Sequence, residues 1–183
     1  MERLKHNIIA TVIIFFIPLI AFANTYGVAL SSPINIHASD PDDIGGGQIM
    51  LTYDPARFQW RHFNIHFDGG YTYFHSPHVH HHSNISILSV APVIRHRYKQ
   101  RGPIQPYLDL SIGLSYLSKT RFEWHDLGMH FAFQDRIGAG ILFGERHQFT
   151  LGMSAIHYSN AHLSRHNPGI SVPLMINASY SFA

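Results

Sequence analysis

Alternation of apolar and polar residues with a period of two is the feature that most limits how this chain can fold. Between residues 149 and 160, one set of alternate positions is Phe149, Leu151, Met153, Ala155, His157 and Ser159. The other set is Thr150, Gly152, Ser154, Ile156, Tyr158 and Asn160. Successive side chains of a strand point to opposite faces. The segment therefore predicts a strand with one largely apolar face and one mixed polar face.

The same pattern returns along the chain, about ten residues at a time and separated by turns. The predicted strands are 25–37, 46–54, 60–75, 84–98, 103–118, 127–143, 147–159 and 170–182. In the last of these, Val172 and Leu174 are assigned to the apolar face and Ser171 to the other. An apolar outside with a small, polar inside, in an even number of strands, is typical of a transmembrane barrel. We therefore expect an all-β, eight-stranded antiparallel transmembrane β-barrel; a soluble barrel or sandwich with its apolar face inward is the alternative.

The connections between these strands alternate in length. After the second, fourth and sixth strands they are short: DPARFQ, KQRG and GERH. After the first, third, fifth and seventh strands they are longer: SDPDDIGGG, SPHVHHHS, KTRFEWHD and NAHLSRHNPG. Short turns at one end and long loops at the other are the pattern of outer-membrane barrels, whose long loops face the outside of the cell.

The first residues have the composition of an export signal. Arg3 and Lys5 precede an apolar run over residues 8–22, which closes on an A-x-A site at 21–23. This predicts a signal peptide at 1–23 and a barrel domain at 24–183, with a retained membrane anchor as the alternative. Without residues 1–23, the 13 basic and 11 acidic residues become 11 and 10, so net charge gives no argument for nucleic acid. The chain has no cysteine, so disulfides do not stabilise it.

His157 and Ser159 are candidate catalytic residues because they share the outward face of the seventh strand. If the first strand rises from the periplasm, the seventh ends at the outer surface, and both side chains face lipid at the level of the outer leaflet. Neighbours i and i+2 are roughly 6.5–7 Å apart at the backbone, a gap that two side chains can close. An imidazole there could take the proton of a serine hydroxyl. The alternative is that both are polar residues in the headgroup zone.

Several segments resemble the lipid A 3-O-deacylases of the PagL type, which are eight-stranded outer-membrane barrels. The match is close in FQDRIGAG (133–140) and AIHYSNA (155–161), and weaker in GGYTY (69–73) and LSVAPV (88–93). The resemblance implies an outer-membrane esterase that removes the 3-O-linked acyl chain of lipid A, with its active site facing the outer leaflet. It implies His157 as the base, Ser159 as the nucleophile and an oxyanion region with backbone donors at Asn160. Lipid A and the outer membrane are the expected partners, without a cofactor, for a monomer or a homodimer.

Two positions depart from the family pattern. A family glycine in the oxyanion region falls at His162, whose backbone can still donate. The family's triad glutamate, twelve residues after the nucleophile, falls at Ser171, and no acidic residue follows Glu145. The rivals are therefore a catalytically silent barrel with a structural or ligand-binding role, and an esterase with a different acyl target.

Asp135 is the best-placed acid to replace the missing glutamate. A hairpin folded about Glu145 places Asp135 opposite Ala155, one diagonal step from His157 on the same face. We hypothesise that Asp135 orients His157, directly or through water. The alternative is a structural role, paired with Arg136 or with another strand.

Histidines are frequent, with sixteen in the chain, and they crowd the second long loop. His78, His80, His81 and His82 are an alternative metal site, because imidazoles at this density can bind Zn²⁺, Ni²⁺ or Cu²⁺. A loop without placed carboxylate or thiolate partners selects weakly, so we expect a solvated polar loop and no metal.

Overall fold

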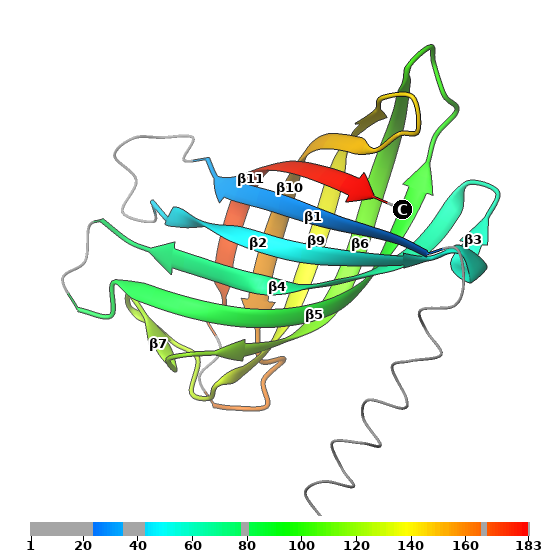
Figure 1. Ribbon diagram of the computed structural model, residues 1–183. Helices are drawn as coiled ribbons and strands as arrows, with labels where there is room; N and C mark the ends of the chain where they lie inside the picture. The colour runs from blue at the N-terminus through cyan, green and yellow to red at the C-terminus, as the bar shows by residue number, and fades with distance from the viewer. Residues whose placement is uncertain (1–23, 35–42, 78–80, 166–167, 183) are drawn as a thin grey trace, which may run out of the picture.

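The computed structural model describes residues 24–34, 43–77, 81–165 and 168–182. Eight long strands form the wall of a barrel (Figure 1): β1 (Asn24–Pro33), β2 (Gly45–Pro55), β4 (Phe63–His75), β5 (Asn84–Arg97), β6 (Ile104–Leu117), β9 (Phe131–Phe143), β10 (Phe149–Ser159) and β11 (Ile170–Phe182). The expected signal peptide at 1–23 lies outside the described residues.

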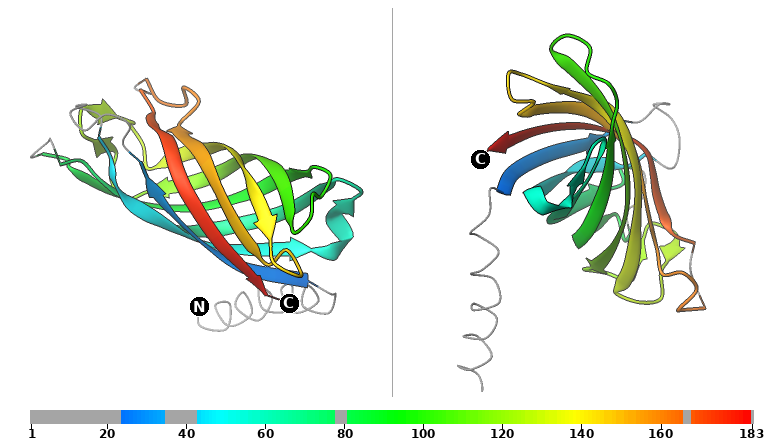
Figure 2. Two further views of the ribbon diagram at one scale, coloured as in Figure 1. Left: turned by 90° about the horizontal axis from the view of Figure 1, so that it is seen from above. Right: turned by 90° about the vertical axis from the view of Figure 1, so that its right-hand side faces the viewer.

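The wall closes because β1 pairs with both β2 and β11. Tyr26 lies opposite Tyr53 on one side and Phe182 on the other, and every pairing is antiparallel. Figure 2 shows the strands tilted around a common axis. The prediction of an eight-stranded antiparallel barrel is confirmed.

Strand bounds agree with the prediction to within a few residues, and the larger differences lie at the connections. The turn before β4 contains a short 3-10 helix, η2 (Ala56–Phe58), and the short strand β3 (Gln59–Trp60), so β4 begins at Phe63 and not at residue 60. The loop after β6 contains a hairpin of β7 (Arg121–Phe122) and β8 (His125–Asp126), so β9 begins four residues later than predicted, at Phe131. Within the described residues, no helix is long and apolar enough to cross a membrane.

The outside of the barrel is apolar, as the alternation predicts. Large hydrophobic side chains stand exposed on several strands, including Leu51 at 65%, Ile112 at 68% and Met153 at 57%. Most of their neighbours in the sequence are buried in the barrel. Such a surface suits a hydrocarbon environment and would be unfavourable in water.

Part of the barrel interior is filled by a charged network. Arg136 of β9 forms an ion pair with Asp68 of β4, and Thr52 also donates to that carboxylate at 2.8 Å. Arg95 donates two hydrogen bonds to Asp109, at 2.8 and 2.7 Å. The space left among these side chains is only about 70 Å³. The interior is therefore a packed core of paired charges.

The interior toward the long loops is apolar, which differs from the small, polar inside that the sequence predicts. Phe74, Ile156 and Tyr158 are fully or nearly fully buried there, and Phe122 and Leu127 from the loop after β6 pack with them. Because a loop closes this end over the strands, these inward positions lie in a dry core.

The last strand also differs from its predicted faces. The pairing of β10 with β11 shifts between Ser154–Met175 and Ile156–Val172, so that two residues of β11 oppose Ala155. This β-bulge reverses the alternation toward Ile170. Val172 is therefore buried inside and Ser171 exposed outside, the opposite of the sequence assignment, while Leu174 in the bulge is half-buried.

Removing one interior cation should destabilise the barrel strongly. Arg136→Ala leaves Asp68 buried without its ion pair, and breaking a buried pair costs about 3 kcal/mol or more of unfolding free energy. Urea unfolding in lipid vesicles, followed by tryptophan fluorescence, measures this change.

Arg121→Ala is the matched control, because Arg121 pairs with Asp126 at 2.8 Å with 57% of its side chain exposed. An exposed pair contributes less than about 1 kcal/mol. Equal losses of stability in the two variants would contradict a stabilising role for the interior pair.

Candidate functional site

Three neighbouring strands bring the candidate residues together on the outside of the barrel. His157 of β10 lies opposite Asp135 of β9 on one side and opposite Ser171 of β11 on the other. The strands run side by side in Figure 2. The sequence placed Asp135 opposite Ala155, and this register is wrong. Phe143 pairs with Phe149 around a turn closed by a His147 N–H to Gly144 carbonyl bond of 3.1 Å, which centres the hairpin on residue 146.

Ser171 is the hydrogen-bond partner of the His157 ring. The Ser171 Oγ lies 2.8 Å from His157 Nδ1, so the residue at the position of the family's glutamate contacts the imidazole. If Nδ1 carries the proton and donates it to this hydroxyl, Nε2 keeps its lone pair free. A neutral hydroxyl can fix the tautomer and the orientation of the ring, but it adds no charge.

Asp135 faces His157 without a direct bond to it. Both side chains are half-buried on the outer surface, and no hydrogen bond or ion pair between them occurs in the described part of the chain. Arg136, the next residue, points inward to Asp68, so it does not pair with Asp135.

Ser159 is the last residue of β10 and follows His157 by two positions on the same face. It lies opposite Phe133 of β9, and the pairing with β11 has already ended at Tyr158–Ile170. Within the described residues, Ser159 Oγ makes no hydrogen bond to the His157 ring. Catalytic hydrogen bonds are often long without substrate and shorten in the complex, so the arrangement remains suited to a serine nucleophile and an imidazole base.

A tight turn follows Ser159. The Leu163 N–H donates to the Asn160 carbonyl at 3.0 Å, and the two central residues have positive φ: Ala161 at 51° and His162 at 63°. The Asn160 side chain is buried and donates to the Leu127 carbonyl at 2.7 Å, away from the outer face. The N–H groups of Ala161 and His162 make no hydrogen bond within the described residues. These two N–H groups lie directly after Ser159.

Gly169 packs against the His157 ring, and sequence reasoning missed it. A Cβ added at Gly169 would lie 2.5 Å from His157 Cε1 and 3.0 Å from Nε2. Its φ of +71° is also a left-handed conformation that favours glycine. Gly169 belongs to the Asn-Pro-Gly sequence before β11, but only the structure places this glycine against the histidine.

An apolar groove of about 550 Å³ runs over the outer wall beside these residues. His157, Asp135 and Ser171 line its polar side. The rest of its lining is mostly apolar: Leu110, Ile112, Ile137, Ala155, Ile156, Val172 and Pro173. A hydrocarbon chain could therefore lie against the barrel with a polar group beside His157.

The histidine-rich loop is only partly described. His78 and His80 lie outside the described residues, and His81 and His82 are exposed. Among the residues that the structure does describe, no group of three or more His, Cys, Asp or Glu side chains could hold a metal ion.

Comparison with known proteins identifies close relatives. Residues 45–181 match the family model of lipid A 3-O-deacylase (PagL). The lipid A deacylase PagL of Pseudomonas aeruginosa is 38% identical over 127 residues, which are 67% of this chain and 70% of that protein. The lipid A deacylase PagL of Bordetella bronchiseptica is 32% identical over 76 residues, 42% of this chain and 41% of that protein. The crystal structure of the outer membrane enzyme PagL superposes with a TM-score of 0.66 at 26% identity, covering 84% of this chain and 98% of that one.

Substitution of Gly169 should impair Ser159 as a nucleophile. Gly169→Ala pushes the His157 ring out of place, and a misplacement of about 1 Å can slow a reaction about 100-fold. We expect labelling of Ser159 by a fluorophosphonate, followed by mass spectrometry, to slow by at least about tenfold.

Gly102→Ala is the matched control, because Gly102 has a similar φ of +60° but nothing within 4 Å of an added Cβ. Labelling should proceed at the unmodified rate in this variant. An equal slowing in both variants would mean that the contact between Gly169 and His157 has no role.

Proposed function

Because this chain belongs to the lipid A 3-O-deacylase (PagL) family, we propose that it is an outer-membrane esterase that removes the 3-O-linked acyl chain from lipid A. The observation that carries the proposal is the outward row formed by His157 and its hydrogen-bonded partner Ser171, with Ser159 two residues away on the same face. The apolar groove beside this row is suited to an acyl chain.

In the proposed mechanism, His157 acts as general base and Ser159 as nucleophile. Nε2 takes the hydroxyl proton while Ser159 Oγ attacks the carbonyl carbon of the ester. The tetrahedral intermediate collapses when His157 returns the proton to the 3-oxygen of the sugar, which leaves. An acyl group then remains on Ser159. Water, deprotonated by His157, hydrolyses this acyl-enzyme and releases the fatty acid, so no metal is needed.

Backbone donors after Ser159 are proposed to stabilise the oxyanion. The N–H groups of Ala161 and His162 have no partner in the described residues and follow the nucleophile directly. Donors that are already in place at a developing negative charge are among the largest contributions to catalysis. In this proposal, only the backbone of Asn160 belongs to the oxyanion region, because its side-chain amide donates to the Leu127 carbonyl.

Ser171 is proposed as the residue that positions His157, in place of the family's glutamate. The 2.8 Å contact supports this role, because a neutral hydroxyl can orient the imidazole without placing a charge beside it. Asp135, directly opposite His157, is proposed to stabilise the imidazolium across the strand pair, directly or through water. This arrangement replaces one acid by a neutral partner and a more distant carboxylate.

The orientation and assembly follow from the same proposal. Residues 1–23 serve as the signal peptide, and the active site faces the outer leaflet, where lipid A resides. His157, Ser159 and Ser171 come from one chain, so the reaction needs no residue from a second copy. The homodimer stays a prediction from the sequence, which sedimentation in detergent can test.

The lipid A of cells that express the protein tests the function. We expect a mass spectrum with lipid A species that lack one 3-hydroxyacyl chain, and this loss should disappear in Ser159→Ala and in His157→Ala. An unmodified spectrum from cells with a folded barrel would favour the catalytically silent barrel. Loss of a different chain would favour an esterase with another target.

Variants at position 171 test the positioning role. Ser171→Ala removes one neutral hydrogen bond to the ring, about 1 kcal/mol, and should lower kcat about fivefold. Ser171→Glu restores the acid of the family and should raise kcat above that of the unmodified protein, because a carboxylate also stabilises the imidazolium.

Asp135, the other residue beside the His157 ring, is tested by measuring kcat in the same assay. Asp135→Asn removes a charge while keeping the shape of the side chain, and a lower kcat supports its electrostatic role. Near-normal turnover in a folded Asp135→Asn barrel would remove Asp135 from the mechanism. Normal turnover in Ser171→Ala would do the same for Ser171.

A further inference from the structure

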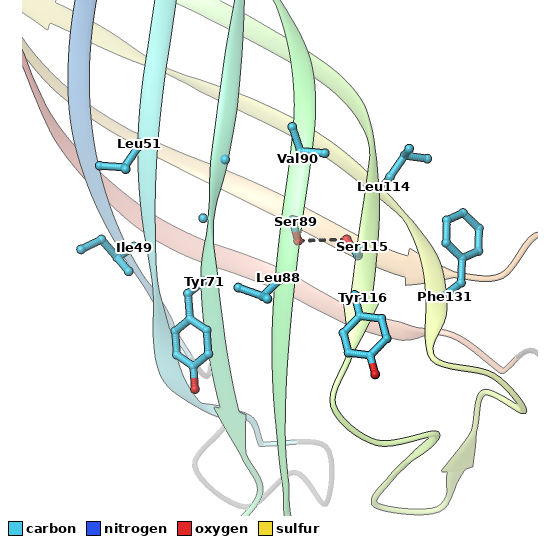
Figure 3. Close-up of a pocket in the computed structure, with 12 residues that line it drawn as sticks. Ile49, Leu51, Tyr71, Leu88, Ser89, Val90, Leu114, Ser115, Tyr116 and Phe131 are labelled. Carbon is cyan, nitrogen blue, oxygen red and sulfur yellow. Dashed lines mark hydrogen bonds between the residues drawn. The ribbon is translucent and has the colours of Figure 1, made fainter. Parts of the chain in front are cut away.

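A second apolar groove, larger than the one beside His157, lies on another part of the outer wall. It spans β2, β4, β5 and β6 and has a volume of about 770 Å³. Figure 3 shows Ile49 and Leu51 at one edge of it, Leu88 and Val90 in the middle, and Leu114, Tyr116 and Phe131 at the other edge. The catalytic residues proposed above do not line it.

Gly69 creates the hollow in this groove. It is an outward position of β4, between Leu51 on β2 and Val90 on β5, which point outward with 65% and 55% exposure. A Cβ added at Gly69 would meet only the Ser89 carbonyl oxygen, at 3.9 Å, and φ is not positive there. Neither the backbone conformation nor a lack of space requires glycine at this position. Because Gly69 has no side chain, the outer surface between Leu51 and Val90 is left as a strip of bare backbone.

A series of cross-strand residue pairs runs from the proposed active site to this groove. Ser159 lies opposite Phe133, Phe133 opposite Leu114, Leu114 opposite Val90, and Val90 opposite Gly69. Gly69 is therefore in the same cross-strand row as Ser159, four strand spacings or roughly 19 Å away along the wall.

The two grooves also adjoin on β6. Its outward residues Leu110 and Ile112 line the groove beside His157, and Leu114 and Tyr116 line the second groove. Ile112 and Leu114 are successive outward residues, roughly 6.5–7 Å apart. The two grooves therefore meet along β6.

Polar groups gather at the loop end of the second groove. Tyr71 and Tyr116 point toward that end in Figure 3, and the Tyr71 hydroxyl lies 2.8 Å from Ser86 Oγ. Lys119 follows β6 there and donates to Asn84 Oδ1 at 2.5 Å. Within the described part of the chain, Lys119 has no acidic partner. An exposed cation above an apolar groove is complementary to a lipid with an anionic headgroup.

We propose that this groove binds a second acyl chain of the same lipid A molecule whose 3-O-acyl ester lies at Ser159. This inference rests on the proposed function and adds a binding site that holds the substrate during hydrolysis. Lipid A carries several acyl chains on one headgroup, so a molecule with its ester at Ser159 has further chains to place along the wall. The lining around Gly69 is mostly apolar, as a site for an acyl chain requires, and Lys119 lies at the loop end, where the headgroup would be.

Filling the hollow tests the proposal. Gly69→Leu places a side chain in the strip and leaves the backbone unchanged. We expect kcat/KM for hexa-acylated lipid A in detergent micelles to fall about tenfold, mainly through KM, the equivalent of about 1.4 kcal/mol of binding. Hydrolysis of p-nitrophenyl 3-hydroxydecanoate, which has one chain, should be unchanged. Ala178→Leu, at an exposed outward position of β11 outside both grooves, is the matched control and should match the unmodified protein on both substrates.

Each of the other results contradicts the proposal that this groove binds an acyl chain. Normal kcat/KM on lipid A in Gly69→Leu overturns the proposal, and so does an equal fall on both substrates or in Ala178→Leu. If the unmodified protein hydrolyses neither substrate, the proposed function fails by itself. Equilibrium binding of lipid A to Ser159→Ala, with and without Gly69→Leu, then decides the groove: weaker binding supports the site, and unchanged binding rejects it.

Discussion

The lumen of an eight-stranded barrel has room for little more than the barrel's own side chains, and here they fill it. Arg136 with Asp68 and Arg95 with Asp109 occupy one part, and an apolar cluster that includes Tyr158 closes the loop end. No substrate of the size of a lipid can enter such an interior. Chemistry on a lipid must therefore take place on the outer wall, which the membrane makes accessible to acyl chains.

Along each strand of the site, the inward side chains stabilise the barrel and the outward ones form the proposed active site. On β9, Arg136 points inward to its ion pair, and Asp135 beside it points outward. On β10, Tyr158 is fully buried between His157 and Ser159, which face outward. The contacts of the buried residues fix the positions of the strands. The outward side chains on the same strands are therefore also held in place. A site built on strands in this way is held more precisely than one on loops.

Sequence periodicity was sufficient for the barrel, for its strand count and for the outward placement of His157 and Ser159, because β10 is regular at these residues. Periodicity did not predict the cross-strand register where a bulge or a turn adds a residue to one strand relative to its partner. The bulge in β11 reverses the side of Ser171, and the turn after Phe143 shifts Asp135 by two positions along β10. Neither change alters the composition of the strand, so period alone cannot detect it. The left-handed φ of 63° at His162, where the family pattern has a glycine, was likewise not predicted from the sequence.

An acid beside a catalytic histidine has two separable effects: it fixes the ring and it stabilises the charge that forms on it. A serine can supply only the first. On a lipid-facing wall this substitution has a physical advantage, since a hydroxyl loses less than a carboxylate when water is excluded. In the proposed mechanism, the second effect comes from Asp135, one strand away from His157, whose carboxylate would act on the imidazolium without bonding the neutral ring. The resting enzyme would thus hold His157 through Ser171, and the carboxylate would contribute only as charge develops.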